Sequence, residues 1–166
     1  PLDSLPTSRQ MRIANLSGFP GFVRSLGAEP RALMERHEIN PVVIRDPDHY
    51  VECQAFVDLL EDCSTSFNNS LFGLQLAALQ NADVFGSVAA LGRAASTVRE
   101  AVTSFIEYIP VVHSPATILE LVEGEKTAEL RWRVGSNLGN NQQANYQAAL
   151  LDLKFFQLIS GGVLKP

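Results

Sequence analysis

The chain has 166 residues, of which 46% are hydrophobic and 19% are charged, which is the composition of one ordinary globular domain. Its 18 acidic and 13 basic side chains give a formal net charge of -5 without a cluster of Lys and Arg, so it is unsuited to gripping nucleic acid by itself. No apolar stretch reaches the roughly 18 residues of a membrane span, and the N-terminal segment lacks the pattern of a secretory signal. We therefore expect a cytoplasmic protein with no membrane partner.

The N-terminal part of the sequence alternates between loops and short helices. Residues 1–17 mix Pro, Ser, Asp and Arg without periodicity, which predicts a flexible arm ahead of a single domain over residues 18–166. The apolar positions in residues 22–26 predict a short helical turn, and Pro30 is well placed in the first turn of a second helix. The two prolines of "NPVVIRDPDHYV" then favour an extended connection with a turn.

The next apolar pattern predicts a longer helix over residues 52–67, followed by a helix that Ser70 caps. The longer helix contains Cys53 and Cys63, whose ten-residue separation corresponds to roughly 15 Å along the axis. A disulfide requires Cα atoms within about 7 Å, so we expect both cysteines to be reduced and buried.

A pair of helices follows. Residues 85–95 predict one helix, and Thr97 caps the next helix, with Glu100 as its partner in a capping box. The second helix is expected to end at Pro110, because proline disfavours helical backbone in the residue before it.

Two glycines, Gly86 and Gly92, enclose several of the small residues in the first helix of this pair. Glycine costs about 1 kcal/mol in a helix interior, so a compensating role is expected. Two interpretations remain open: another helix or a sheet packs closely against the backbone here, or the missing side-chain volume lines a ligand cavity.

The spacing of the apolar residues then changes from the helical period to strict alternation. The runs "ATILELVEG" and "TAELRWRVG" predict an antiparallel hairpin with one buried face, covered by a helix or by further strands because two strands alone are marginally stable. Asn140 or Asn141 opens a long final helix that stops at Gly161. The expected fold is α+β: a predominantly helical layer beside a small antiparallel sheet, with a long C-terminal helix.

A search for catalytic and metal-binding patterns yields none. His37, His49 and His113 are scattered and lack the spacing of metal ligands, so no metal or other cofactor is expected. The adjacent acids Glu61 and Asp62 lie on diverging faces of one helix and are expected to be solvated. No nucleophile has an evident base partner, so we expect no enzymatic activity.

Several segments occur in an order that resembles a known family. They are "RSLGAEPRALMERHEI", "RDPDHYV", "ECQAFVDLLEDC", "NNSLFGLQLAA" and "DVFGSVAALGRAASTVREAVTSFIEYI". The chain resembles, over roughly residues 21–161, the N-terminal effector-binding (arabinose-binding-like) domain of AraC-type bacterial transcription regulators. The most specific part is residues 86–101, which includes Thr97, Glu100 and Ala101.

The resemblance implies a regulatory function. Such a domain binds a small effector, here of unknown identity, or associates as a homodimer, and thereby controls a C-terminal helix-turn-helix region. This sequence ends at "ISGGVLKP" without that region, so we expect DNA contacts only through a part that is absent from this chain. The alternative is an oligomerisation module without a ligand, because the apolar residues of the last helix exceed one narrow stripe.

A ligand pocket is expected between the inner face of the hairpin and the neighbouring helices, where aromatic and small residues concentrate. The candidate lining residues are Phe85, Arg93, Phe105, Tyr108, Arg131, Trp132, Tyr146 and Phe156. Either Arg93 or Arg131 is available for an anionic group. The competing interpretation is core packing for each aromatic residue and a solvated side chain for each arginine.

Overall fold

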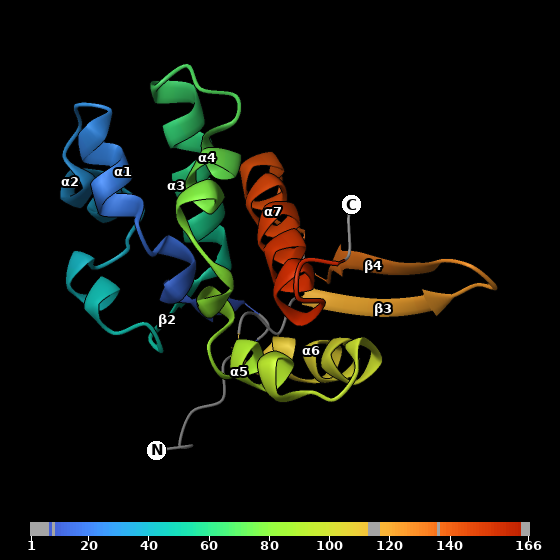
Figure 1. Cartoon of the computed structure of the whole chain (residues 1–166). Helices are drawn as coiled ribbons and strands as arrows, with labels where there is room; N and C mark the ends of the chain where they lie inside the picture. Colours follow the sequence, from blue (N-terminus) through green and yellow to red (C-terminus); the bar gives the residue numbers. More distant parts are fainter. Residues whose placement is uncertain (1–6, 8, 113–116, 136, 164–166) are drawn as a thin grey trace.

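A computed structural model describes residue 7 and residues 9–112, 117–135 and 137–163 (Figure 1). These residues contain seven α-helices and two antiparallel sheets of two strands each. The predicted α+β class is confirmed, with helices predominating beside a small hairpin and a long helix near the C-terminus.

Residues 10–16, which belong to the predicted arm, are part of the folded body. Strand β1 (Gln10–Arg12) pairs antiparallel with β2 (Tyr50–Glu52), and a 3-10 helix, η1 (Ile13–Leu16), follows it. Met11 and Leu16 are buried in the core. The predicted arm was therefore too long, because pairing with β2 satisfies the backbone of this segment while its apolar side chains leave water.

The next elements are α1 (Phe19–Ser25), α2 (Pro30–Arg36) and a 3-10 helix, η2 (Pro41–Arg45). Helix α2 begins at Pro30 as predicted, and the Glu29 side chain caps it by accepting a hydrogen bond from a backbone N–H. The predicted extended connection is partly wrong, since η2 occupies its first half. The Asn40 side chain caps η2 and so stabilises this turn of helix.

Helix α3 (Cys53–Ser66) agrees with the prediction, and its two cysteines are buried and form no disulfide. Helix α4 (Phe72–Leu79) begins without a side-chain cap, so the predicted cap at Ser70 is wrong. The Asn69 side chain instead accepts a hydrogen bond from the Leu71 backbone N–H in the preceding turn. This asparagine therefore orders the turn before the helix rather than the helix itself.

The predicted helix over residues 85–95 is interrupted. A 3-10 helix, η3 (Ala82–Phe85), ends at Gly86, and α5 (Ser87–Ala94) begins after it. Gly86 has φ +58° and ψ −128°, which only glycine adopts readily. A side chain there would also meet the guanidinium group of Arg12, whose Nη1 lies 2.5 Å from an ideal Cβ position.

The second glycine of this segment, Gly92, lies inside α5 and faces α7 (Gln142–Ile159). A Cβ atom on it would lie 2.9 Å from a methyl carbon of Ile159 and 3.0 Å from the ring of Phe155. The position therefore fits the interpretation of close packing between helices.

Helix α6 (Val98–Val112) begins with the predicted capping box: the Glu100 backbone N–H donates to Thr97 Oγ1 over 3.1 Å. The predicted end at Pro110 is wrong, because the helix continues to Val112. Ile109 is only 1% exposed, and its burial in the core outweighs the local preference of a residue that precedes proline.

The predicted hairpin is formed by β3 (Thr117–Glu123) and β4 (Ala128–Val134), with Leu119 opposite Trp132 and Glu120 opposite Arg131. Helix α6 covers β3, and Arg99 of α6 forms an ion pair with Glu123. The turn end of the hairpin extends away from the helices (Figure 1). Its inner face is therefore buried at the base and only half-buried further out.

Helix α7 joins two hydrophobic cores. Its deeply buried face consists of two glutamines and two apolar residues, namely Gln143, Gln147, Leu151 and Phe155. Leu151 and Phe155 pack with Phe85 and Phe105 in one core, while Ala144 contacts the other core, formed by η1, α1, α3 and α4. The helix ends before Gly161, which has positive φ as expected for a helix terminator.

Two contacts attach α4 to α7. At the first, Gly73 meets the backbone of α7: its N–H donates to Gln143 Oε1 over 2.9 Å, and an ideal Cβ on Gly73 would lie 2.0 Å from the Gln143 carbonyl oxygen. At the second, Lys154 Nζ donates to the carbonyl oxygens of Ala77 and Gln80 at the end of α4. The lysine thus brings a positive charge and additional donors to the carbonyl groups at the C-terminal end of α4.

Candidate functional site

Two adjacent cavities lie between α7 and the base of the hairpin. Both are lined by Thr117, Trp132, Ala148 and Leu151. The larger has a free volume of about 50 Å³ and reaches α3 and η1, while the smaller, of about 10 Å³, lies toward α6. Together they have room for a few water molecules, so a larger guest requires the hairpin base to move.

A buried polar network forms one wall of the larger cavity. Gln147 Nε2 donates to the Asn15 carbonyl oxygen over 2.7 Å and to Gln80 Oε1 over 2.9 Å. Gln80 Nε2 in turn donates to the carbonyl oxygens of Asn15 and Ser17. The side chains of Gln80 and Gln147 therefore hold the Asn15 backbone carbonyl, and with it η1, against α7 in a region without bulk water.

One atom of this network lacks a partner among the described residues. Asn15 lines the larger cavity and is 1% exposed, and its Oδ1 accepts no hydrogen bond from the described part of the chain. Its Nδ2 donates to the Arg12 carbonyl oxygen over 2.9 Å, so flipping the amide would place two acceptors against each other. An unsatisfied buried acceptor costs about 1–3 kcal/mol, and a bound donor would recover that cost.

The smaller cavity contains a carboxyl group. Asp152 lies one turn after Ala148 on α7, and the other residues around this cavity are apolar or aromatic apart from Thr117. Burial raises the pKa of Asp152 to about 7. No described residue forms a hydrogen bond or an ion pair with its side chain, so the ionised form has no compensating partner.

The sequence profile of the N-terminal arabinose-binding domain of AraC transcription regulators matches residues 27–161. The chain belongs to this family. It is also 33% identical, over 125 residues, to the HTH-type transcriptional regulator VirS of Mycobacterium tuberculosis, in both strain CDC 1551 / Oshkosh and strain ATCC 25618 / H37Rv. The alignment covers 75% of this chain and 36% of the relative, so the chain matches about a third of the relative's length.

Three of the predicted site residues of the arabinose-binding domain meet at the smaller cavity: Phe85, Phe105 and Trp132. Phe85 and Phe105 also pack edge to face, with ring centroids 5.0 Å apart, and Phe105 stacks on Phe155 at 4.2 Å. These two phenylalanines are thus core residues that also form a cavity wall. Trp132 is half-buried and lines both cavities.

The two predicted arginines are on the surface, away from both cavities. Arg93 forms an ion pair with Asp83, and Arg131 forms one with Glu129 on the outer face of the hairpin, with 3.2 Å between Arg131 Nη2 and Glu129 Oε2. The geometry therefore supplies no arginine for an anionic group in these cavities.

The three remaining aromatic candidates also lie outside the cavity walls. Tyr108 is 43% exposed, and the Tyr146 hydroxyl accepts a hydrogen bond from the Gln142 side chain over 2.6 Å. Phe156 is half-buried against the edge of Phe155. Gly86 and Gly92 are likewise not among the cavity-lining residues of the described ranges, so these glycines are explained by backbone conformation and packing.

Sequence reasoning missed the polar residues of the site, Asn15, Gln80, Gln147 and Asp152. Asn15 lies in the segment assigned to the arm, and the glutamines look like ordinary surface residues. Asp152 could have been predicted to be buried, because it lies between leucines in "ALLDLKFF".

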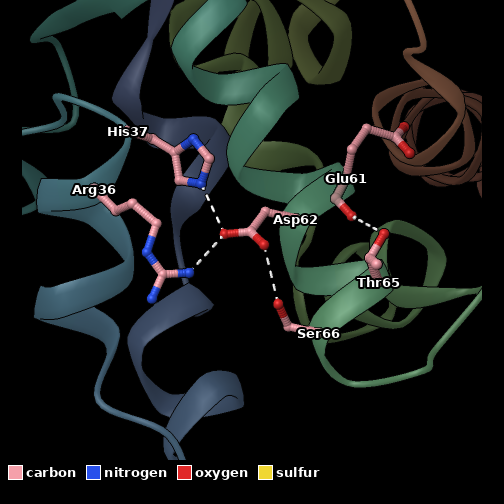
Figure 2. A network of polar contacts seen from close by, with 6 residues as sticks. All are labelled: Arg36, His37, Glu61, Asp62, Thr65 and Ser66. Carbon is pink, nitrogen blue, oxygen red and sulfur yellow. Dashed lines mark hydrogen bonds and ion pairs between the residues drawn. The ribbon is translucent and has the colours of Figure 1, made fainter.

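A second polar cluster ties α3 to its neighbours, and it corrects the expectation that Glu61 and Asp62 are solvated (Figure 2). Asp62 accepts hydrogen bonds from His37 Nε2 at 2.9 Å, from Arg36 and from Ser66. The hydrogen bond from His37 is the main cause of the lowered pKa of Asp62. The predicted divergence of the two acids is confirmed, since Asp62 faces α2 and Glu61 faces α7.

Glu61 stabilises the first turn of α7. Its carboxylate accepts hydrogen bonds from the Gln143 backbone N–H over 2.7 Å and from the Asn140 side chain over 2.9 Å. An acceptor with negative charge is favourable there because the N–H groups of the first helical turn have no partner within the helix.

We expect Glu61→Ala to lower the free energy of unfolding by about 1 kcal/mol, because the first turn of α7 loses its acceptor. Urea unfolding of both proteins measures the difference. Glu61→Gln keeps an acceptor without the charge and should lose less. Equal losses for the two variants would contradict the role of the hydrogen bond.

The described residues contain no group of three or more His, Cys, Asp and Glu side chains that could hold a metal ion. His113 lies outside the described residues. Within the same residues, every helix is too short or too polar to span a bilayer.

Proposed function

We propose that this arabinose-binding domain senses a small molecule in the cavities beneath the hairpin base and controls a DNA-binding region outside this chain. Family membership and the similarity to an HTH-type regulator support the regulatory role. The observation that carries the sensing role is the cavity pair itself, which is lined by Asn15 and Asp152, two residues whose Oδ1 atom and carboxyl group lack partners among the described residues. Regulation of transcription places the protein in the cytoplasm, where bacterial DNA is found.

The proposed unit is one regulatory domain. It comprises residues 18–166 together with the buried residues 10–16, which belong to the same core. Its net charge of -5 supports the proposal that DNA is contacted elsewhere in a longer protein. The family is one of transcription regulators, and we assign no catalytic step to the domain.

The proposed mechanism is a shift between two conformations. In the observed one, Trp132 and α7 enclose the cavities from opposite elements, and the cavities admit only a few water molecules. A ligand that needs more room binds better when the hairpin base is displaced, so it increases the population of that conformation. The hairpin would then have one orientation in the free domain and another in the ligand-bound domain, and this difference would act on the rest of a regulator.

A thermal-shift screen tests the sensing role. A binding compound is expected to raise the Tm of the domain, with a shift that grows with ligand concentration. Ala148→Leu places side-chain volume in both cavities and should abolish that response. Ala149→Leu is the matched control, because Ala149 is exposed on the same helix.

Two outcomes would contradict the sensing role: no compound raises the Tm, or Ala148→Leu responds as strongly as the wild type. Ala148→Val fills less of the cavities. If the leucine variant folds poorly, the ligand response of the valine variant is compared with that of the wild type instead.

A second candidate function is self-association through the hairpin, with or without a ligand. The outer half of its inner face presents Leu121 opposite Leu130, both half-buried, and each strand has a free edge within the described residues. Two copies related by a twofold axis could pair along such edges. This is the form of the homodimer that we consider for the domain.

Light scattering at several protein concentrations tests the dimer. We expect a dimer for the wild type and a monomer for the double variant Leu121→Ser with Leu130→Ser, because pairing would bury this apolar patch. The double variant Glu120→Ser with Arg131→Ser changes the outer face and should remain dimeric. A monomeric wild type at high concentration would exclude this function.

A further inference from the structure

We propose that the ligand of the two cavities is a small organic cation whose ammonium group pairs with Asp152 while a second N–H group donates to Asn15 Oδ1. The inference rests on the proposed sensing function and names the chemical class of the effector. Four observations on the described residues carry it.

The first observation is the balance of donors and acceptors. Gln147 Nε2 uses both of its hydrogens inside the protein, on Asn15 and Gln80. Asn15 Nδ2 is likewise engaged with a backbone carbonyl, whereas Oδ1 of the same side chain accepts nothing. The buried group of this network that is left for a guest is therefore an oxygen atom, Asn15 Oδ1, which needs an N–H or O–H donor.

The second observation is the sign of the charge. Apart from the Cys53 thiol, Asp152 is the one ionisable residue among the described residues that line either cavity, and no Lys, Arg or His accompanies it. An anionic ligand would meet a carboxylate without a counter-charge. A cation instead stabilises the ionised carboxylate that burial disfavours.

The third observation is the aromatic wall. Trp132 lines both cavities and is half-buried at the hairpin base. The face of an indole ring attracts a nearby cation, most strongly where water is excluded. Phe56 and Leu151 complete an apolar wall, so a hydrocarbon segment between the two polar ends of the ligand fits.

The fourth observation is the distribution of the two acceptors. Asn15 lines the larger cavity, Asp152 lines the smaller one, and Ala148 lines both and leaves space between them. A ligand that reaches both acceptors therefore needs two N–H groups joined by a short hydrocarbon segment, as in an aliphatic diamine.

Calorimetric titration of the domain with cadaverine tests the inference, with pentylamine and glutarate as length-matched monoamine and dianion at constant ionic strength. We expect cadaverine to bind, pentylamine to bind more weakly and glutarate not to bind. Asp152→Asn should weaken cadaverine binding by about 30-fold or more, because it removes the charged partner in a buried pair.

Proton release provides a readout specific to Asp152. Near pH 6 its carboxyl is largely protonated in the free domain, since burial raises its pKa to about 7. Binding of an ammonium group would release about one proton per ligand, measured from titrations in buffers with different ionisation enthalpies. Asp152→Asn should release none through this site.

The outcomes separate this inference from the proposed function. Cadaverine binding that is unchanged by both Asp152→Asn and Ala148→Leu would overturn the assignment of the site. If only neutral or anionic compounds bind, and Ala148→Leu blocks them, the domain is a sensor but its ligand is not a cation. If no compound of any class binds in a manner that Ala148→Leu blocks, the sensing function itself fails.

Discussion

Replacing Gly73 with alanine is expected to lower the free energy of unfolding by about 3 kcal/mol. An added Cβ would lie 2.0 Å from the carbonyl oxygen of Gln143, a backbone atom that no rotamer change can move. The two helices would have to separate, which also breaks the hydrogen bond from the Gly73 N–H to Gln143 Oε1. Since α7 packs on both hydrophobic cores, the displacement would affect the whole domain.

Urea unfolding followed by circular dichroism measures this loss. Gly21→Ala is the matched control, because Gly21 is also helical and an added Cβ there would meet no atom within 4 Å. Alanine is the better helix former, so the control should be as stable as the wild type or up to about 1 kcal/mol more stable. Similar stability of the Gly73 variant and the wild type would show that the α4–α7 contact is not fixed as described.

The second large effect is a dependence of stability on pH that arises from Asp152. Burial raises its pKa from 3.8 to about 7, so the native state holds a proton that the unfolded state has already lost between these values. The free energy of unfolding should therefore fall as pH rises from about 4 to about 7 and then level off. One pKa unit corresponds to about 1.4 kcal/mol, so the full shift sets an upper limit of about 4 kcal/mol.

Asp152→Asn should remove this dependence, so the variant becomes progressively more stable than the wild type as pH rises toward 7. The difference between the two proteins, measured by urea unfolding at a series of pH values, isolates the effect of this carboxyl group. Asp62→Asn should show the opposite sign: its native pKa is lowered, so its contribution is present at neutral pH and is lost in acid. A constant difference for Asp152→Asn would mean that its carboxyl group is solvated.

Local signals in the sequence predicted most of the elements. Helix α3, the Thr97–Glu100 capping box and the β3–β4 hairpin follow from apolar spacing, cap chemistry and alternation, each read within a short window. The errors arise where contacts between residues far apart in the sequence determine the local structure. Strand β1 forms only because β2 lies beside it, and α6 continues past Pro110 because Ile109 is held in the core.

The candidate site was harder to predict than the fold. Three of the eight predicted residues reach a cavity, because aromatic residues at a hairpin base often face the neighbouring helices. The polar groups were not predicted because their role depends on contacts between residues distant in the sequence: Gln147 and Asn15 are 132 positions apart. No local pattern marks a glutamine on α7 as a partner of a backbone carbonyl near the N-terminus.

The position of α7 between the two cores has a consequence for local opening. If either half of the domain loosened alone, one side of this helix would be exposed to water while the other remained packed. Backbone amide hydrogens in its middle turns should therefore exchange with solvent only when the entire domain unfolds, whereas those near the hairpin turn should exchange within seconds. Cooperativity between the halves then comes from a single shared helix, even though their hydrophobic clusters are distinct.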